Sequence, residues 1–203
     1  MSMLRIAIVT GSTRPGRNNE AVARWVYELA RRRQDAQFEF VDIADYALPL
    51  LDEPASAMFG KYAKPHTKAW SEKIGTFDGY VFVTPEYNHS VSGALKNAID
   101  FLYREWNDKA AGFVSYGGGA SGARAVEHLR LVMAELKVAT VRAQVLLSLV
   151  TDFEGFRSFR PLPQREGELT ELLDQVVAWA AALRTVREPR VRETGAVSVG
   201  VSR

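Results

Sequence analysis

The stretch that decides the fold is residues 81–88, Val-Phe-Val-Thr-Pro-Glu-Tyr-Asn. Its continuous apolar start predicts a buried strand, which breaks at Pro85 into a polar and aromatic loop. In an open parallel sheet, ligands bind outside the carboxyl ends of the strands. Pro85 fixes the backbone and Tyr87 offers an aromatic surface, so this corner is suited to hold a flat ring. The alternative is an ordinary turn between a strand and a helix.

Apolar runs and helical spacings alternate along the whole chain. Continuous apolar runs predict strands at 4–10, 38–43, 80–84, 110–116 and 139–149. Helical spacing predicts helices at 22–29, 68–75, 92–106, 126–136 and 169–183. Strands that alternate with helices form right-handed βαβ units and a parallel sheet. We therefore expect an α/β protein, a doubly wound three-layer αβα sandwich around a five-stranded sheet.

Three segments fall outside this alternation. Residues 45–66 contain three prolines and little periodicity, and long excursions in compact domains tend to be functional. Residues 151–167 are expected to form another loop. We expect one domain over residues 1–188, followed by a patternless C-terminal tail at 189–203.

Composition excludes several classes of protein. The chain of 203 residues is 47% hydrophobic and 25% charged, as in globular proteins that fold in water. It has no cysteine, which excludes disulfides, thiolate catalysis and iron–sulfur clusters. Its three histidines, at 66, 89 and 128, lack zinc-site spacing, so no metal site is expected. A net charge of +2 without a basic run argues against nucleic acid or membranes as partners, and we expect a cytoplasmic location.

The first loop, residues 11–19, has the sequence Gly-Ser-Thr-Arg-Pro-Gly-Arg-Asn-Asn and lies between a predicted strand and a helix N-terminus. Free backbone N–H groups and the helix dipole favour an anion there. Ser12, Arg14, Arg17 and the amide of Asn18 or Asn19 add donors to phosphate oxygens. The alternative is a capped turn with solvated arginines.

The same loop nearly matches a Walker A loop. Gly11 and Gly16 have the required spacing, but Arg17 and Asn18 replace the lysine and the hydroxyl residue. The groups that bind β/γ-phosphates and magnesium are therefore missing. One phosphate is the expected ligand, not a triphosphate.

A glycine-rich loop follows the fourth predicted strand. Gly117, Gly119 and Gly122 formally match the dinucleotide pattern G-x-G-x-x-G, but the pattern should follow the first strand. The acid that should reach a ribose is also not evident, since Glu135 lies mid-helix. The glycines are still expected to let a ligand approach the backbone N–H groups closely. The alternative is a flexible turn.

The ends of strands one, three and four thus offer an anion cup, an aromatic corner and a glycine shelf. In a sheet ordered 2-1-3-4-5 the first and third strands are neighbours at the switch point, where flavin mononucleotide (FMN) binds. One phosphate and one flat ring suit that ligand.

These motifs resemble those of the NAD(P)H-dependent FMN reductase family. The resemblance rests on Gly-Ser-Thr-Arg at 11–14, Thr-Pro-Glu-Tyr-Asn at 84–88, Ala-Leu-Lys-Asn-Ala-Ile-Asp at 94–100 and the glycine turn before 123–124, and it spans about residues 4–150. It implies a flavodoxin-like fold. Relatives reduce quinones, azo compounds or chromate.

The resemblance also implies a set of cofactor-binding residues. It assigns the phosphate to Ser12, Arg14, Arg17 and Asn19, the isoalloxazine to Pro85, Glu86, Tyr87 and Asn88, and the other edge of the ring to Ser115, Tyr116, Gly117 and Gly118. No catalytic side chain is required for hydride transfer, because the cofactor supplies the chemistry. The chain departs from many relatives at Arg17, where they have serine, and at Ser92, where they have proline.

The expected function is hydride transfer from NADPH or NADH through FMN to a small acceptor, which is a quinone, free flavin, azo compound or metal oxyanion. One alternative is a flavodoxin-type electron carrier without reductase activity, although carriers are usually acidic and this chain has a pI near 8.9. A second alternative is a phosphate-ester enzyme without flavin.

The family implies a homodimer, sometimes paired into a tetramer. The helix predicted at 92–106 contains Tyr103 and Trp106, which suit a buried interface, and packing into its own core is an equal alternative. The segment 45–66 contains more apolar residues than a solvated loop should, which predicts an interaction surface.

Overall fold

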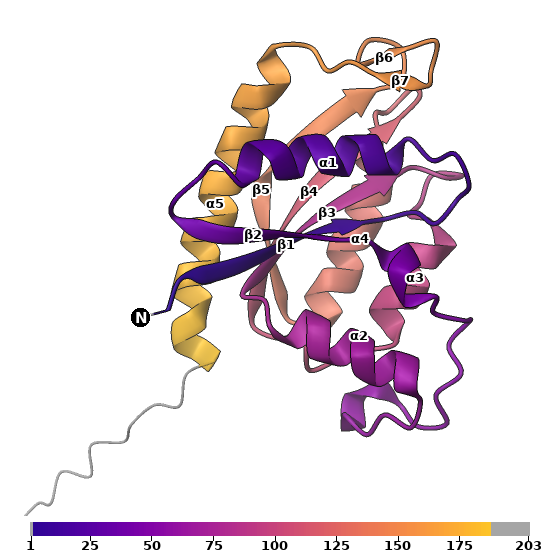
Figure 1. Cartoon of the computed structure of the whole chain (residues 1–203), viewed down its shortest axis with the longest axis vertical. Helices are drawn as coiled ribbons and strands as arrows, with labels where there is room; N and C mark the ends of the chain where they lie inside the picture. The colour runs from indigo at the N-terminus through magenta and orange to yellow at the C-terminus, as the bar shows by residue number, and fades with distance from the viewer. Residues whose placement is uncertain (1, 188–203) are drawn as a thin grey trace, which may run out of the picture.

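The computed structural model describes residues 2–187, and these form one parallel sheet covered on both faces by helices (Figure 1). The strands are β1 (Leu4–Thr10), β2 (Ala36–Val41), β3 (Gly79–Pro85), β4 (Lys109–Gly117) and β5 (Val138–Ser148). Their order is β2-β1-β3-β4-β5, and all four pairings are parallel. The predicted fold class and strand order are confirmed.

Helices on the two faces complete the three layers. One face carries α1 (Asn19–Ala30) and α5 (Gln164–Arg187), and the other carries α2 (Pro65–Gly75), α3 (Gly93–Asp100) and α4 (Ala123–Glu135). Short 3-10 helices η1 (Ile43–Tyr46) and η2 (Ala57–Phe59) interrupt the excursion between β2 and α2. No helix within residues 2–187 is both long and apolar enough to cross a membrane.

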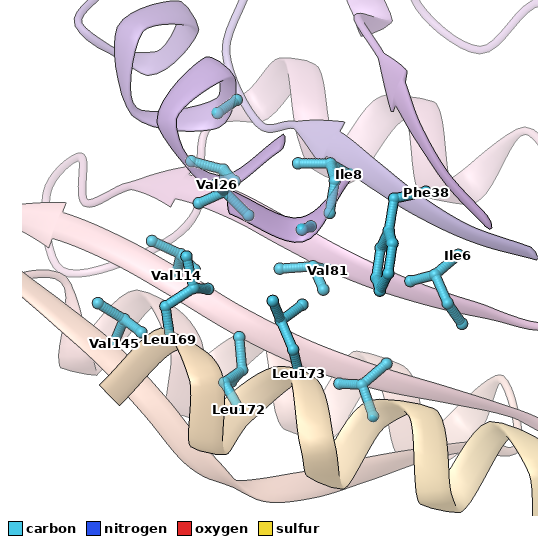
Figure 2. Packing of buried hydrophobic residues seen from close by; sticks show 14 of the residues in the cluster. Ile6, Ile8, Val26, Phe38, Val81, Val114, Val145, Leu169, Leu172 and Leu173 are labelled. Carbon is cyan, nitrogen blue, oxygen red and sulfur yellow. The ribbon is translucent and has the colours of Figure 1, made fainter. Parts of the chain in front are cut away.

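The central strands β3 and β4 are buried along their whole length because helices cover both faces of the sheet. Along β1, Ile6 and Ile8 point to the α1/α5 side, and Ala7 and Val9 point to the opposite side. Figure 2 shows the first of these two cores, where Ile8 and Val81 of the sheet lie between α1 and the leucines of α5. The two cores fix the sheet, so the loops at its carboxyl edge are attached to a rigid base.

The predicted helix at 92–106 was too long. The helix ends at Asp100, and turns follow to Asp108, whose φ of 58° lies in the left-handed region. Trp106 is fully buried in the core, and its indole N–H donates to the carbonyl of Ile99 at 3.1 Å. The expectation that Trp106 anchors an interface is therefore wrong, and the core alternative holds.

Two other segments add to the sequence prediction. The expected loop at 151–167 contains a small antiparallel hairpin of β6 (Phe153–Glu154) and β7 (Ser158–Phe159), and α5 already begins at Gln164. The expected tail at 189–203 lies outside the described residues.

Candidate functional site

A cavity of about 750 Å³ lies at the carboxyl edge of the sheet, where β1, β3, β4 and β5 end. It is lined by residues 14–18 and Ala21, by residues 85–87 and 116–118, and by Leu149, Phe156 and Arg157. Eight of the twelve predicted cofactor residues are therefore brought together: Arg14, Arg17, Pro85, Glu86, Tyr87, Tyr116, Gly117 and Gly118. Ser12, Asn19, Asn88 and Ser115 do not line it.

Ser12 lies under the first loop instead of on its surface. Its side chain is buried, and its Oγ accepts a hydrogen bond from the backbone N–H of Arg14 at 3.3 Å. The same oxygen lies 3.2 Å from the hydroxyl of Tyr87. Ser12 therefore connects the first loop to the aromatic corner after β3.

Asn19 is a structural link between strands. It is fully buried; its Oδ1 accepts from the N–H of Gly11 at 2.9 Å, and its Nδ2 donates to the carbonyl of Val83 at 2.8 Å. Both ends of the amide are occupied by backbone of β3 and of the loop after β1. Asn19 thus links the first loop to β3, and its contact with phosphate stays a prediction.

The two arginines of the first loop differ in what they contact. Arg14 is exposed at the mouth of the cavity and has no hydrogen bond or ion pair from its guanidinium within residues 2–187. Arg17 pairs with Asp42, whose other oxygen accepts from Thr10 at 2.8 Å, and the Nε of Arg17 is buried without a partner among the same residues. A free cation beside the start of α1 is the arrangement that binds a phosphate.

The corner after β3 is a tight turn. Tyr87 and Ser90 exchange two backbone hydrogen bonds, of 2.9 and 3.1 Å. Asn88 and His89 between them have φ of 50° and 68°, and asparagine tolerates this left-handed region better than most residues. The turn places Asn88 outward, which explains why it does not line the cavity, and leaves the face of Tyr87 at the wall.

The glycine loop after β4 lines the cavity next to the corner after β3. An added Cβ would meet nothing within 4 Å at Gly118, so a ligand can approach its backbone. Gly122 has φ of 85°, and a Cβ there would lie 2.6 Å from that of Ser115. Ser115 is fully buried and donates to the carbonyl of Ser121 at 3.0 Å, so it holds this loop.

Tyr116, the last buried aromatic of β4, lies at the bottom of the site. Its ring centroid is 5.9 Å from that of Phe153, and burial raises the pKa of its hydroxyl above the ordinary value of 10.0. The phenol therefore stays neutral over the physiological range and presents an apolar ring with one hydroxyl.

The β6–β7 hairpin is the part of the site that sequence reasoning missed. Phe156 has φ of 61°, and its carbonyl accepts from the Nδ2 of Asn18 at 2.9 Å, which attaches the hairpin to the first loop. Phe156 and Arg157 extend the cavity wall. A glycine between two short aromatic segments, here Gly155, is a signal for such a hairpin.

These groups fit FMN in kind. Arg14 and the start of α1 supply the anion end, while Tyr87, Tyr116 and the open backbone of Gly118 supply surfaces for a flat ring. The volume lies within the range of cofactor pockets. No cluster of three metal-binding side chains occurs among residues 2–187.

Comparison with known proteins agrees with this arrangement. The profile described as NADPH-dependent FMN reductase matches residues 4–152, most of the chain. The chain belongs to the NADPH-dependent FMN reductase family. This family membership makes the protein an oxidoreductase that uses FMN and NAD(P)H.

Individual relatives support the family assignment. An NAD(P)H-dependent FMN reductase of Nectria sp is 38% identical over 189 residues, 89% of each chain. A 2-hydroxy-1,4-benzoquinone reductase of Burkholderia sp is 38% identical over 141 residues, 66% of this chain and 73% of the relative. The solved flavoenzyme NAD(P)H:acceptor oxidoreductase FerB of Paracoccus denitrificans has the same fold, with a TM-score of 0.69, 22% identity and coverage of 88% and 98%. The flavodoxin-like fold of this FMN reductase family member is thus shown by sequence and by shape.

Proposed function

We propose that this FMN reductase family member passes electrons from NAD(P)H to a quinone-type small molecule. The observation that carries the proposal is one cavity that joins a free arginine, at the β1/β3 switch point, to a ring-sized wall of Tyr87 and glycine backbone. The name of the Burkholderia relative supports a quinone as the class of acceptor.

Each part of the cavity has a separate task. Arg14 and the first turn of α1 bind the FMN phosphate, and the wall of Pro85, Tyr87 and Gly118 orients the isoalloxazine. Tyr116 excludes water from beneath it. Bound FMN supplies the redox chemistry, which takes two electrons from a reduced nicotinamide and passes them to the acceptor. No side chain has to donate or accept a proton in this scheme.

One experiment tests this function. Purified protein should regain the visible absorption of a flavin on soaking with FMN, and it should then oxidise NADPH when a quinone is added. A flavodoxin-type carrier would bind FMN without oxidising NADPH. A phosphate-ester enzyme would stay colourless, and either result would refute the proposal.

Donor and acceptor are proposed to use the same face of the site in turn. The motivation is a single glycine shelf, at Gly117 and Gly118, with no dinucleotide fingerprint elsewhere in the sequence. Initial rates at varied NADPH and quinone should then give parallel double-reciprocal lines. Intersecting lines with a demonstrable ternary complex would exclude a shared face.

We also propose a cytoplasmic homodimer that covers the open side of the cavity. Support comes from four large apolar side chains of the segment between η1 and α2, which are 49–86% exposed: Leu50, Leu51, Met58 and Phe59. Exposed groups of this kind mark interaction surfaces. Asn97 of α3 holds the segment, accepting from the N–H of Leu51 at 3.0 Å and donating to the carbonyl of Pro49 at 2.7 Å. The absence of cysteine is in keeping with a reducing compartment.

Light scattering at micromolar concentration tests the dimer and separates it from a tetramer. Leu50→Asp combined with Phe59→Asp should yield a monomer that retains FMN poorly. The matched control is Leu131→Asp on α4, an exposed leucine away from this surface. A wild-type monomer with full activity would refute the dimer proposal.

A further inference from the structure

Glu86 carries a buried carboxylate of which only one oxygen is used. Its side chain is 7% exposed, and Oε1 accepts from the Nε of Arg124 at 2.6 Å and also pairs with Nη2 of the same residue. Oε2 is buried and has no hydrogen-bond partner among residues 2–187. A buried charged oxygen without a donor is costly, and such groups in native proteins require an explanation.

Arg124 holds the carboxylate, and β4 holds the backbone of Glu86. The backbone N–H of Glu86 donates to the carbonyl of Tyr116 at 3.0 Å. The Cβ of Glu86 lies 3.4 Å from the position that a Cβ on Gly117 would take. Arg124, from the first turn of α4, fixes Oε1. The unpaired oxygen is therefore preorganised in a residue that lines the cavity.

The position of Glu86 indicates which end of a ligand it meets. Arg14 belongs to the loop after β1, whereas Glu86 is bonded to β4, two strands away across β3. A cofactor that has its phosphate at Arg14 presents the far end of its ring system near β4. An ionised carboxylate can only accept hydrogen bonds, and at that end of oxidised flavin the donor is the imide N3–H of the pyrimidine ring.

We propose that Oε2 of Glu86 accepts a hydrogen bond from the imide N3–H of FMN, and that Arg124 is the positioning residue that aims it. This inference rests on the proposed placement of FMN in the cavity. The Glu86–Arg124 pair would then select flavins that have a hydrogen-bond donor at N3. The negative charge of Glu86 also opposes the negative charge that the pyrimidine ring gains on reduction, so this carboxylate lowers the reduction potential relative to a neutral residue beside Arg124.

The test compares FMN with N3-methyl FMN, which lacks the donor, by titration of apoprotein followed through flavin fluorescence. The wild-type protein should prefer FMN by about ten- to hundred-fold, the size of one hydrogen bond to a charged group. Glu86→Ala should reduce this preference to roughly threefold or less, because the acceptor is gone. The ratio of two ligands on one protein cancels any general loss of folding.

Two further variants complete the design. Glu127→Ala, an exposed carboxylate on the same helix as Arg124, should keep the wild-type preference. Glu86→Gln should raise the midpoint potential of bound FMN, an effect that a purely structural role would not produce. Arg124→Gln should lower the preference for FMN without abolishing it.

The outcomes separate this inference from the proposed function. If wild-type protein binds neither flavin, the FMN site itself is wrong and the inference fails with it. If it binds both flavins equally, or if Glu86→Ala keeps the wild-type preference, FMN binding stands and the assignment of Glu86 is overturned. If Glu86→Ala also loses the preference for FMN over flavins modified in the ribityl chain, Glu86 contacts the sugar chain, and the assignment to N3–H is overturned.

Discussion

The two edges of the sheet use charged side chains in opposite ways. At the amino edge, Asp78 accepts from the backbone N–H of Arg5 at 2.9 Å and from Arg184 at 2.6 Å, and it also pairs with Arg187. At the carboxyl edge, Arg14 and Oε2 of Glu86 have no partner among residues 2–187. Both edges are charged, but Asp78 is bonded on several sides, whereas Arg14 and Oε2 of Glu86 keep hydrogen-bonding capacity beside a cavity.

Perturbed pKa values occur at both edges, at Lys109 and at Tyr116, so a pKa shift alone does not select one edge. Burial, helped by the nearby charge of Arg187, lowers the pKa of Lys109 to about 7 at the amino edge. Its Nζ donates to the hydroxyl of Tyr80 at 3.0 Å and to the carbonyls of Ile74 and Gly75 at 3.3 Å. Strongly shifted groups suggest functional sites only as a matter of probability. We place the candidate site at the carboxyl edge because unsatisfied groups line a cavity there.

Removing the buried amine of Lys109 at the amino edge should have the largest effect on the free energy of unfolding. Between pH 7 and 10.5 the unfolded chain holds a proton on Lys109 that the folded chain has lost. The free energy of unfolding of the wild type should therefore rise with pH across this window. Lys109→Met cannot titrate, so its stability relative to wild type should be highest below pH 7 and fall by up to about 5 kcal/mol toward pH 10.5.

Urea unfolding at several pH values measures this difference. Lys68→Met on the exposed side of α2 is the control and should show no pH-dependent difference from wild type. A constant difference between Lys109→Met and wild type at all pH values would mean that the lysine titrates normally.

Removing the free cation tests the functional edge. Arg14→Ala should weaken FMN binding by about 1.5–3 kcal/mol, roughly ten- to hundred-fold, because one charge-assisted contact to phosphate is lost. Its stability without FMN should stay near that of wild type, since Arg14 makes no pair in residues 2–187. Titration of apoprotein with FMN measures the loss, with Arg24→Ala on the outer side of α1 as the control. Equal dissociation constants would count against the phosphate assignment.

Arg17→Ala compares a paired arginine with Arg14, which has no pair within residues 2–187, and the expected effect is the smallest of the three. Asp42 keeps its hydrogen bonds from Thr10 and Ala44 but loses its charged partner. The free energy of unfolding of the variant should therefore be about 1–2 kcal/mol lower than that of wild type. FMN affinity should fall by less than it does in Arg14→Ala. Denaturant unfolding and FMN titration on the same preparation provide both numbers. A larger loss of affinity than of stability would place Arg17 on the phosphate.

The fold and the cavity at the carboxyl edge were predictable for simple reasons. Strands buried on both faces are continuous apolar runs, and a parallel sheet binds ligands at its carboxyl edge. The individual roles were harder. Asn19 and Ser115 have the same donors and acceptors whether they face a ligand or the backbone, and only the packed structure distinguishes the two. The helix that ends at Asp100 has no glycine or proline stop signal, so the apolar spacing continued to Trp106.

The buried amide of Asn19 has a consequence for how the chain folds. Its bond to Val83 spans 64 positions of sequence and joins the start of α1 to the end of β3. The wall of the cavity therefore cannot form until β3 has docked beside β1, a non-local step that is slow in parallel sheets. Bound FMN should stabilise the folded chain, and the added free energy of unfolding should rise with the logarithm of the FMN concentration above its dissociation constant.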